Sequence, residues 1–225
     1  MELHRDVPTG LVQRLRAGTL DAALVSSIEG HRRPGYAALA GYGIACRDEA
    51  RSVRAFRRQG RPIHRVGVDA GSETSVALLR VLLDRVIGAR EYTVERVEPD
   101  VNVDAYPHDL VLLIGDNGLR AHTDAREVID LGAEWRAWTG LPFVFALWLI
   151  APGADRAAVV ACLTRAAEAG PLIDSTNGAI HYQLDAEDHR GLTRFATEAA
   201  ALGLAEPGLA PTFIAASSPA QKTSP

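Results

Sequence analysis

The sequence predicts an α/β fold with mostly parallel sheets. Short apolar segments alternate with longer segments whose apolar residues recur at helical spacing, as expected for strands joined by helical crossovers. One apolar run, DLVLLIGD (109–116), is uninterrupted and ends in Gly-Asp, which is typical of a central strand of a parallel sheet. The chain has 225 residues, of which 47% are hydrophobic and 23% charged, so it can bury one large core or two smaller ones.

The first elements are expected to be a helix followed by strands. Residues 8–18 repeat apolar side chains at helical spacing and end at Gly18, a common residue at helix C-termini. Short strands are expected to follow at 20–25, 36–46 and 52–58. A second group then begins, with strand 65–69, helix 73–87, strand 91–97 and strand 109–116.

The last part of the chain changes from strands to helices. Helix 131–138 and strand 143–150 are followed by an amphipathic helix at 155–170. Residues 175–203 are expected to add one or two further helices. The tail, 217–225, is small, polar and proline-rich, which predicts disorder.

Composition excludes several classes of function. The net charge of −4 gives no electrostatic basis for binding nucleic acid or an acidic membrane surface. The longest apolar stretch, 141–152, is too short to span a bilayer, and the start of the chain does not resemble a signal peptide. Two distant cysteines and seven scattered histidines predict neither a disulfide framework nor a metal site. We therefore expect a cytoplasmic protein; the oligomeric state is not predicted.

Polar residues gather where the expected strands end. Ser26 follows strand 20–25, three hydroxyl residues follow strand 65–69, and Asp116 follows the apolar run 109–114. In open parallel sheets ligands bind beyond the carboxyl ends of the strands. Hydroxyls and helix N-termini, without lysines, suit a small carboxylated molecule. The alternative is that each residue only caps a helix or forms a turn, with Ser72 or Thr74 as the N-cap of helix 73–87.

One segment, DLGAEWRAWTGLPFVFALW (130–148), resembles the signature of the chorismate dehydratases of the futalosine route to menaquinone. The resemblance continues, in the same order, through GTLDAALVSSIE (18–29), SV (52–53), VDAGSETSVALLRVLL (68–83) and LLIGD (112–116). It implies a two-lobed fold like that of type II periplasmic binding proteins, with a ligand cleft between the lobes. Lobe one is then expected to comprise residues 1–60 and 151–216, and lobe two residues 65–148.

The resemblance also implies an activity. Such enzymes remove water from chorismate to give 3-[(1-carboxyvinyl)oxy]benzoate, with no metal or organic cofactor. Ser52 is expected to act in catalysis from the hinge side. The other expected ligand contacts are Ser26 from the first lobe, the carboxylate-binding Ser72, Thr74 and Ser75, and Gly115 and Asp116 in the wall of the second lobe. Two alternatives stay open: the 1,4-dihydroxy-6-naphthoate synthase of the same pathway, and a non-catalytic intracellular carboxylate-binding protein.

Within the signature, most residues are expected to have structural roles. The aromatic residues are expected to fill the core, and the polar and glycine residues to form turns. The first group is Trp135, Trp138, Phe143 and Phe145, and the second is Asp130, Thr139 and Gly140.

The chain departs from the family pattern at three places. Glu73 stands where the family often has a basic residue, which is expected to weaken anion binding unless the side chain points away. RDEARS (47–52) lacks the Gly-Pro pair that commonly precedes the family's serine. The family's first strand, which ends in a Leu-Asn turn facing the ligand, has no counterpart here. We expect an in-frame upstream extension to encode it, and low activity without it.

Overall fold

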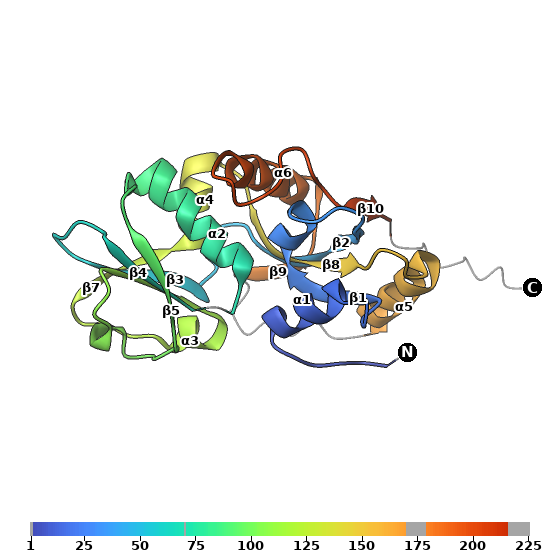
Figure 1. Cartoon of the computed structure of the whole chain (residues 1–225), viewed down its shortest axis with the longest axis horizontal. Helices are drawn as coiled ribbons and strands as arrows, with labels where there is room; N and C mark the ends of the chain where they lie inside the picture. Colours follow the sequence, from blue (N-terminus) through green and yellow to red (C-terminus); the bar gives the residue numbers. More distant parts are fainter. Residues whose placement is uncertain (1, 70, 170–178, 216–225) are drawn as a thin grey trace, which may run out of the picture.

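Two sheets, each of five strands, form the centres of two lobes that lie side by side along the long axis of the molecule (Figure 1). In this computed structural model the described residues are 2–69, 71–169 and 179–215. The two-lobed α/β architecture expected from the sequence is therefore confirmed. The predicted disorder at 217–225 lies outside the described residues.

The first sheet has the strand order β1-β8-β2-β10, and β9 pairs with the second half of β2. Its strands are β1 (Ala22–Ser26), β2 (Ala37–Cys46), β8 (Phe143–Ile150), β9 (Ile180–Gln183) and β10 (Thr212–Ile214). Helices α1 (Pro8–Arg16), α5 (Arg156–Ala169) and α6 (Ala186–Ala201) accompany it. Val12 and Leu15 of α1 pack on one set of sheet residues and Val160 of α5 on another, so helices cover the apolar strands.

The second sheet has the order β5-β4-β6-β3-β7. Its strands are β3 (Val53–Arg58), β4 (Arg65–Asp69), β5 (Thr93–Val97), β6 (Leu110–Ile114) and β7 (Arg126–Asp130). The helices are α2 (Glu73–Leu82), which continues as the π-helical turn η2 (Leu83–Ile87), α3 (Gly115–Arg120) and α4 (Leu131–Thr139). Short 3-10 turns lie at η1 (Ser27–His31), in the first lobe, and at η3 (Val103–Ala105).

The sheets are mixed, so the expectation of mostly parallel sheets is wrong. Parallel pairing joins β2 to β10 and β4 to both β5 and β6, whereas the other described pairs are antiparallel. The reason is that the chain crosses between the lobes after β2 and again after α4. When the chain arrives from the other lobe, the next strand, such as β3 or β8, starts at the edge of the sheet where its neighbours end. It is therefore antiparallel to them.

The same crossings place two strands differently from the expected lobe boundaries. β3 (53–58) pairs in the second sheet, although residues 1–60 were expected in lobe one. β8 (143–150) lies in the middle of the first sheet, although residues 65–148 were expected in lobe two. The expected strand 109–116 ends at Ile114, because Gly115 adopts a φ of 62° and starts α3.

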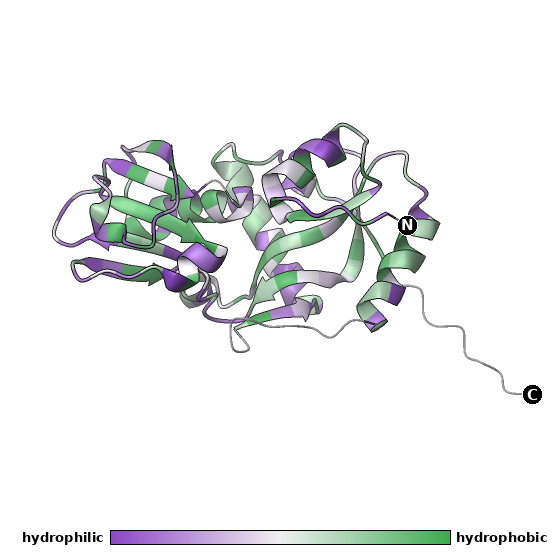
Figure 2. Ribbon diagram, turned by 90° about the horizontal axis from the view of Figure 1, so that it is seen from below, coloured by the Kyte–Doolittle hydropathy of each residue, from purple (hydrophilic) through white to green (hydrophobic). Residues whose placement is uncertain are grey.

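One aromatic cluster links the lobes. Trp135 of α4 is fully buried, packs edge-on against Phe143 of β8 and Phe195 of α6, and donates its indole N–H to the carbonyl of Pro142 at 3.0 Å. The expectation that the signature aromatics fill the core is confirmed for Trp135, Phe143 and Phe145, and Trp138 is partly buried. Figure 2 shows the hydrophobic colouring concentrated on the strands of both lobes. Across the described ranges, no helix is both long and apolar enough to cross a membrane.

Candidate functional site

The topology gathers the expected site residues along the edge of the second sheet that faces the first lobe. β4 and β6 are parallel, so both end at this edge. β3 starts there, since Val53 pairs with Ile114 at the end of β6. Ser52, Gly115 and the start of α2 therefore lie along one edge.

Ser72 is the N-cap of α2. Its Oγ accepts the backbone N–H of Ser75 at 3.3 Å and the hydroxyl of Ser75 at 3.1 Å. Because this oxygen accepts two hydrogen bonds from within the helix, its own proton can be donated to a ligand. Before the cap, Asp69 at the end of β4 accepts the N–H of Gly71 at 2.8 Å. The capping interpretation is confirmed for Ser72.

Thr74 connects the two lobes. It is fully buried, and its Oγ1 accepts the backbone N–H of Ile28 at 3.1 Å and lies 3.3 Å from the hydroxyl of Ser27. Ser27 in turn donates to the carbonyl of Val144 at 2.8 Å. These bonds bring the start of α2 to the end of β1, where Ser26 is 5% exposed. The hydroxyl of Thr74 is thus occupied by protein groups, and its expected contact with a ligand stays a prediction.

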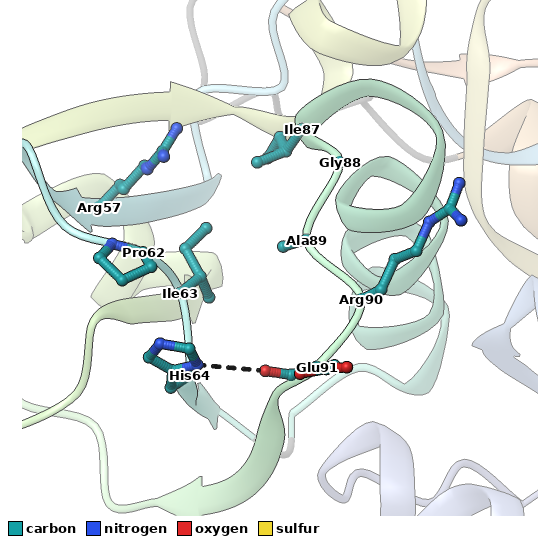
Figure 3. Close-up of a pocket in the computed structure, with 9 residues that line it drawn as sticks. All are labelled: Arg57, Pro62, Ile63, His64, Ile87, Gly88, Ala89, Arg90 and Glu91. Carbon is teal, nitrogen blue, oxygen red and sulfur yellow. Dashed lines mark hydrogen bonds between the residues drawn. The ribbon is translucent and has the colours of Figure 1, made fainter.

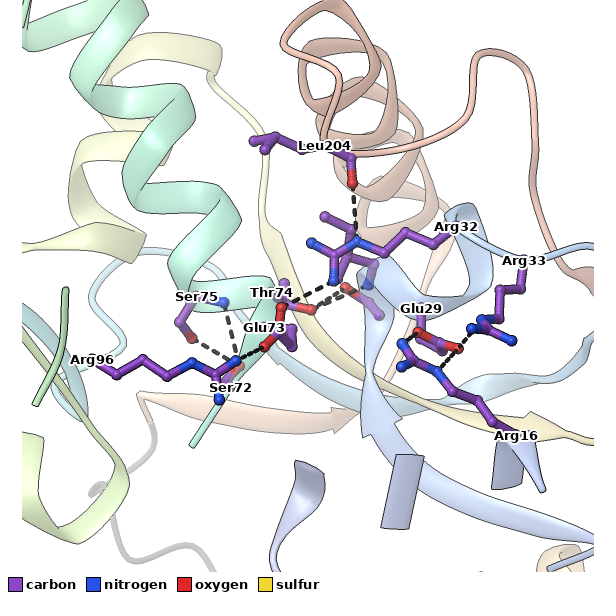
Figure 4. A network of polar contacts seen from close by, with 12 residues as sticks. Arg16, Glu29, Arg32, Arg33, Ser72, Glu73, Thr74, Ser75, Arg96 and Leu204 are labelled. Carbon is purple, nitrogen blue, oxygen red and sulfur yellow. Dashed lines mark hydrogen bonds and ion pairs between the residues drawn. The ribbon is translucent and has the colours of Figure 1, made fainter. Parts of the chain in front are cut away.

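Glu73 lies between two arginines that the sequence did not single out. Arg32 of the first lobe donates to it at 3.0 Å, and Arg96 of β5 reaches it at 3.4 Å (Figure 4). Arg32 also donates to the carbonyl of Leu204, so the ion pair joins η1, α2 and the segment after α6. Two guanidinium groups therefore surround one carboxylate at the start of α2. The only sequence signal for Arg96 was its place near the end of the expected strand 91–97.

A second ion pair anchors η1 to α1. Glu29 is 2% exposed and receives two hydrogen bonds from Arg16, at 2.8 and 2.5 Å (Figure 4). Tyr36 donates to the same carboxylate at 3.3 Å, and burial together with this negative charge raises the pKa of the Tyr36 hydroxyl. The pair fixes the segment that follows Ser26, and with it the first-lobe side of the site.

Ser52 lies at the first crossing between the lobes. It is 6% exposed, and its N–H and its hydroxyl point to the carbonyl of Ala50 at 2.7 and 3.3 Å. A Cβ added at Gly118 of α3 would lie 2.3 Å from the carbonyl oxygen of Ser52, so only glycine allows α3 to approach this closely. Gly115 and Ser52 are thus brought together by the close contact of β3, β6 and α3.

Asp116 does not join this group through its side chain. Its carboxylate is 77% exposed and faces Arg120 one turn further along α3, at 3.8 Å. Asp130 and Gly140, expected as turn formers, are the N-cap and the left-handed C-cap of α4, which confirms their structural role.

Two surface pockets of the second lobe lie away from this edge. One, of about 390 Å³, lies beside His64 at the opposite end of β4 (Figure 3). It is lined by Arg57, Pro62, Ile63, His64, Ile87, Gly88, Ala89, Arg90 and Glu91. The other surrounds Tyr106. Neither contains a residue expected from the sequence to bind a ligand, so they do not coincide with the candidate site.

Comparisons with known proteins identify the family of this chain. The family model described as menaquinone biosynthesis matches residues 1–171, which include all the site residues above except Leu204. The chorismate dehydratase of Thermus thermophilus is 33% identical over 161 residues, covering 63% of this chain and 58% of that protein. The chorismate dehydratase of Campylobacter jejuni is 32% identical over 147 residues, covering 65% and 52%. This chain thus matches little more than half the length of either relative.

Solved structures agree on the fold. A crystal structure of an Archaeoglobus fulgidus protein superposes with a TM-score of 0.65 at 14% identity, covering 91% of this chain and 87% of that one. The periplasmic aliphatic sulphonate binding protein of Escherichia coli gives 0.51 at 15% identity, covering 91% and 82%. The likeness to periplasmic binding proteins expected from the sequence is confirmed.

Proposed function

Because this chain belongs to the menaquinone biosynthesis family, we propose that it removes water from chorismate to form 3-[(1-carboxyvinyl)oxy]benzoate. The observation that carries the proposal is the sequence identity to two chorismate dehydratases, at 33% and 32%. The gathering of hydroxyl-bearing residues at one sheet edge supports it independently.

The reaction makes modest chemical demands on the protein. Chorismate loses one ring proton and the ring hydroxyl as a molecule of water, and the ring becomes aromatic. Aromatisation supplies the driving force, so the main tasks are to orient the substrate and to assist proton transfer. Substrate and product each carry two carboxylates, and the site must therefore accommodate a dianion.

The start of α2 suits one of these carboxylates. The first N–H groups of a helix are free, and its dipole favours negative charge. Ser72 can add a hydroxyl donor, and Arg96, whose side chain is 73% exposed, can add a guanidinium. Ser52 and Ser26 then face the remainder of the bound chorismate, from the hinge and from the first lobe respectively. Closure of the lobes would exclude water from the reacting ring.

Proton NMR of chorismate mixed with the purified chain tests the proposal. The expected result is new aromatic ring signals while the enolpyruvyl methylene signals persist. Replacing both Ser72 and Ser75 with alanine should slow this conversion. The matched control is Thr93→Ala, which removes an exposed hydroxyl at the other end of the sheet. Binding without conversion would favour the carboxylate-binding alternative. If chorismate is neither bound nor converted, the proposal is rejected.

A further inference from the structure

The carboxylate of Asp130 joins the first crossing between the lobes to the start of α4, the helix that precedes the second crossing. It accepts backbone N–H groups from Gly132 and Ala133 at 2.9 and 3.1 Å, which caps α4. It also accepts those of Ala50 and Arg51 at 2.9 and 2.7 Å, in the segment between β2 and β3. An N-cap needs only the first pair of bonds. The second pair ties a distant segment of the chain to the same side chain.

The backbone of Arg51 is strained. Its φ of 59° makes it the one non-glycine residue with positive φ within the described ranges. Such a conformation costs free energy in a residue with a Cβ and persists where the surroundings hold it. The successive N–H groups of Ala50 and Arg51 both point at Asp130, as in backbone turns that bind anions. The carboxylate therefore stabilises this turn directly.

Ser52 comes immediately after the strained residue. Its N–H and hydroxyl turn back to the carbonyl of Ala50, and its own carbonyl is in close contact with Gly118. The turn is also packed tightly against α4, since a Cβ at Gly132 would lie 2.6 Å from the carbonyl oxygen of Asp48. The position of Ser52 thus depends on the turn that Asp130 holds.

We propose that Asp130 is a positioning residue, which fixes Ser52 in the orientation that contacts a carboxylated ligand between the lobes. The ligand contact rests on the proposed function, whereas the fixing of Ser52 does not. Asp185, the N-cap of α6, provides the contrast. It accepts hydrogen bonds from N–H groups of its own helix and forms an ion pair with the exposed side chain of Arg47, and it holds no strained turn.

Asp130→Ser separates the two roles of the carboxylate. Serine is a good N-cap and can keep α4 in place, but it is too short to reach the turn as well. Asp185→Ser is the matched control, and Asp130→Asn is a second variant that keeps the size of the side chain. Chorismate is the probe, titrated by calorimetry. Backbone amide exchange of Ser52 is followed by NMR without ligand.

We expect Asp130→Ser and Asp130→Asn to weaken chorismate binding at least tenfold and to speed exchange of the Ser52 amide by a similar factor. Asp185→Ser should change binding less than twofold. Adding Arg51→Gly to Asp130→Ser should restore part of the affinity, because glycine adopts a positive φ without strain. Equal effects of the Asp130 and Asp185 variants, or unchanged Ser52 exchange, would overturn the proposal. If the natural chain does not bind chorismate, the proposed function fails, and Ser52 exchange alone decides the positioning role.

Discussion

Replacing Thr74 with alanine removes the hydroxyl that connects the lobes. In the structure this oxygen accepts the N–H of Ile28 at 3.1 Å, and Thr74 has no exposed surface. Water cannot replace the lost acceptor, and an unsatisfied buried donor costs about 1–3 kcal/mol. The lost methyl group adds about 0.8 kcal/mol. We therefore expect the free energy of unfolding to fall by about 2–4 kcal/mol, which lowers Tm by roughly 4–16 °C in a chain of this size.

Urea and thermal unfolding of Thr74→Ala, with Thr74→Ser as control, measure this effect. Serine keeps the hydroxyl and loses only the methyl, so it should cost about 1 kcal/mol. If alanine costs no more than serine, the bond to Ile28 does not contribute and the reasoning is refuted. Chorismate titration of both folded variants decides the other role of Thr74. An affinity loss larger in the alanine variant than in the serine variant would mean that the hydroxyl also holds a carboxylate, as the sequence predicts, whereas equal affinities would assign it to the contact between the lobes alone.

Two further predictions concern charge. Glu73→Gln frees its two arginine partners and should lower the free energy of unfolding by at most about 1 kcal/mol. Chorismate affinity measured by calorimetry should rise in this variant and stay unchanged in the control Glu91→Gln at the opposite edge. Weaker binding by the Glu73 variant would contradict the expected role of the arginines. Burial lowers the pKa of His31, whose ring forms a hydrogen bond with the carbonyl of Leu209. The unfolded chain therefore takes up a proton at this ring more readily than the folded chain, and the free energy of unfolding should fall as pH drops below about 6.5. His31→Asn should flatten that dependence in urea titrations at several pH values, and identical pH profiles would contradict the prediction.

The sequence predicted elements whose signals are local. The helix that starts at Glu73 has its N-cap serine, its apolar spacing and its preceding strand within one short segment. β2, β3, β4 and β8 could likewise be located from their apolar runs. β9 and β10 were missed because they are short, and β7 because three of its five residues are charged; only pairing with distant strands makes these segments strands. Strand direction was predicted wrongly for the same reason, since the lobe crossings are not visible in local periodicity.

The candidate site was predicted in part. Ser72 and Gly115 come to one edge because the parallel strands β4 and β6 end together, which the alternation of elements already implied. Ser52 joins them because β3 runs antiparallel to β6 and starts at that edge. Arg32 and Arg96 were missed because their partner Glu73 lies 41 and 23 residues away. A lone arginine in the sequence carries no sign of such a contact. Asp130 was predicted as a turn former, but its bonds to Ala50 and Arg51 span 80 and 79 residues and could not be foreseen.

Amide chemical shifts of the isotope-labelled chain, followed while chorismate is added, locate the ligand site. The largest shifts are expected at Ser26, Ser52, Ser72 and Gly115, along the edge between the lobes. Little change is expected at 62–64 and 87–91, which line the pocket at the opposite end of the sheet. Shifts confined to that pocket, or none at millimolar chorismate, would show that the ligand does not bind between the lobes.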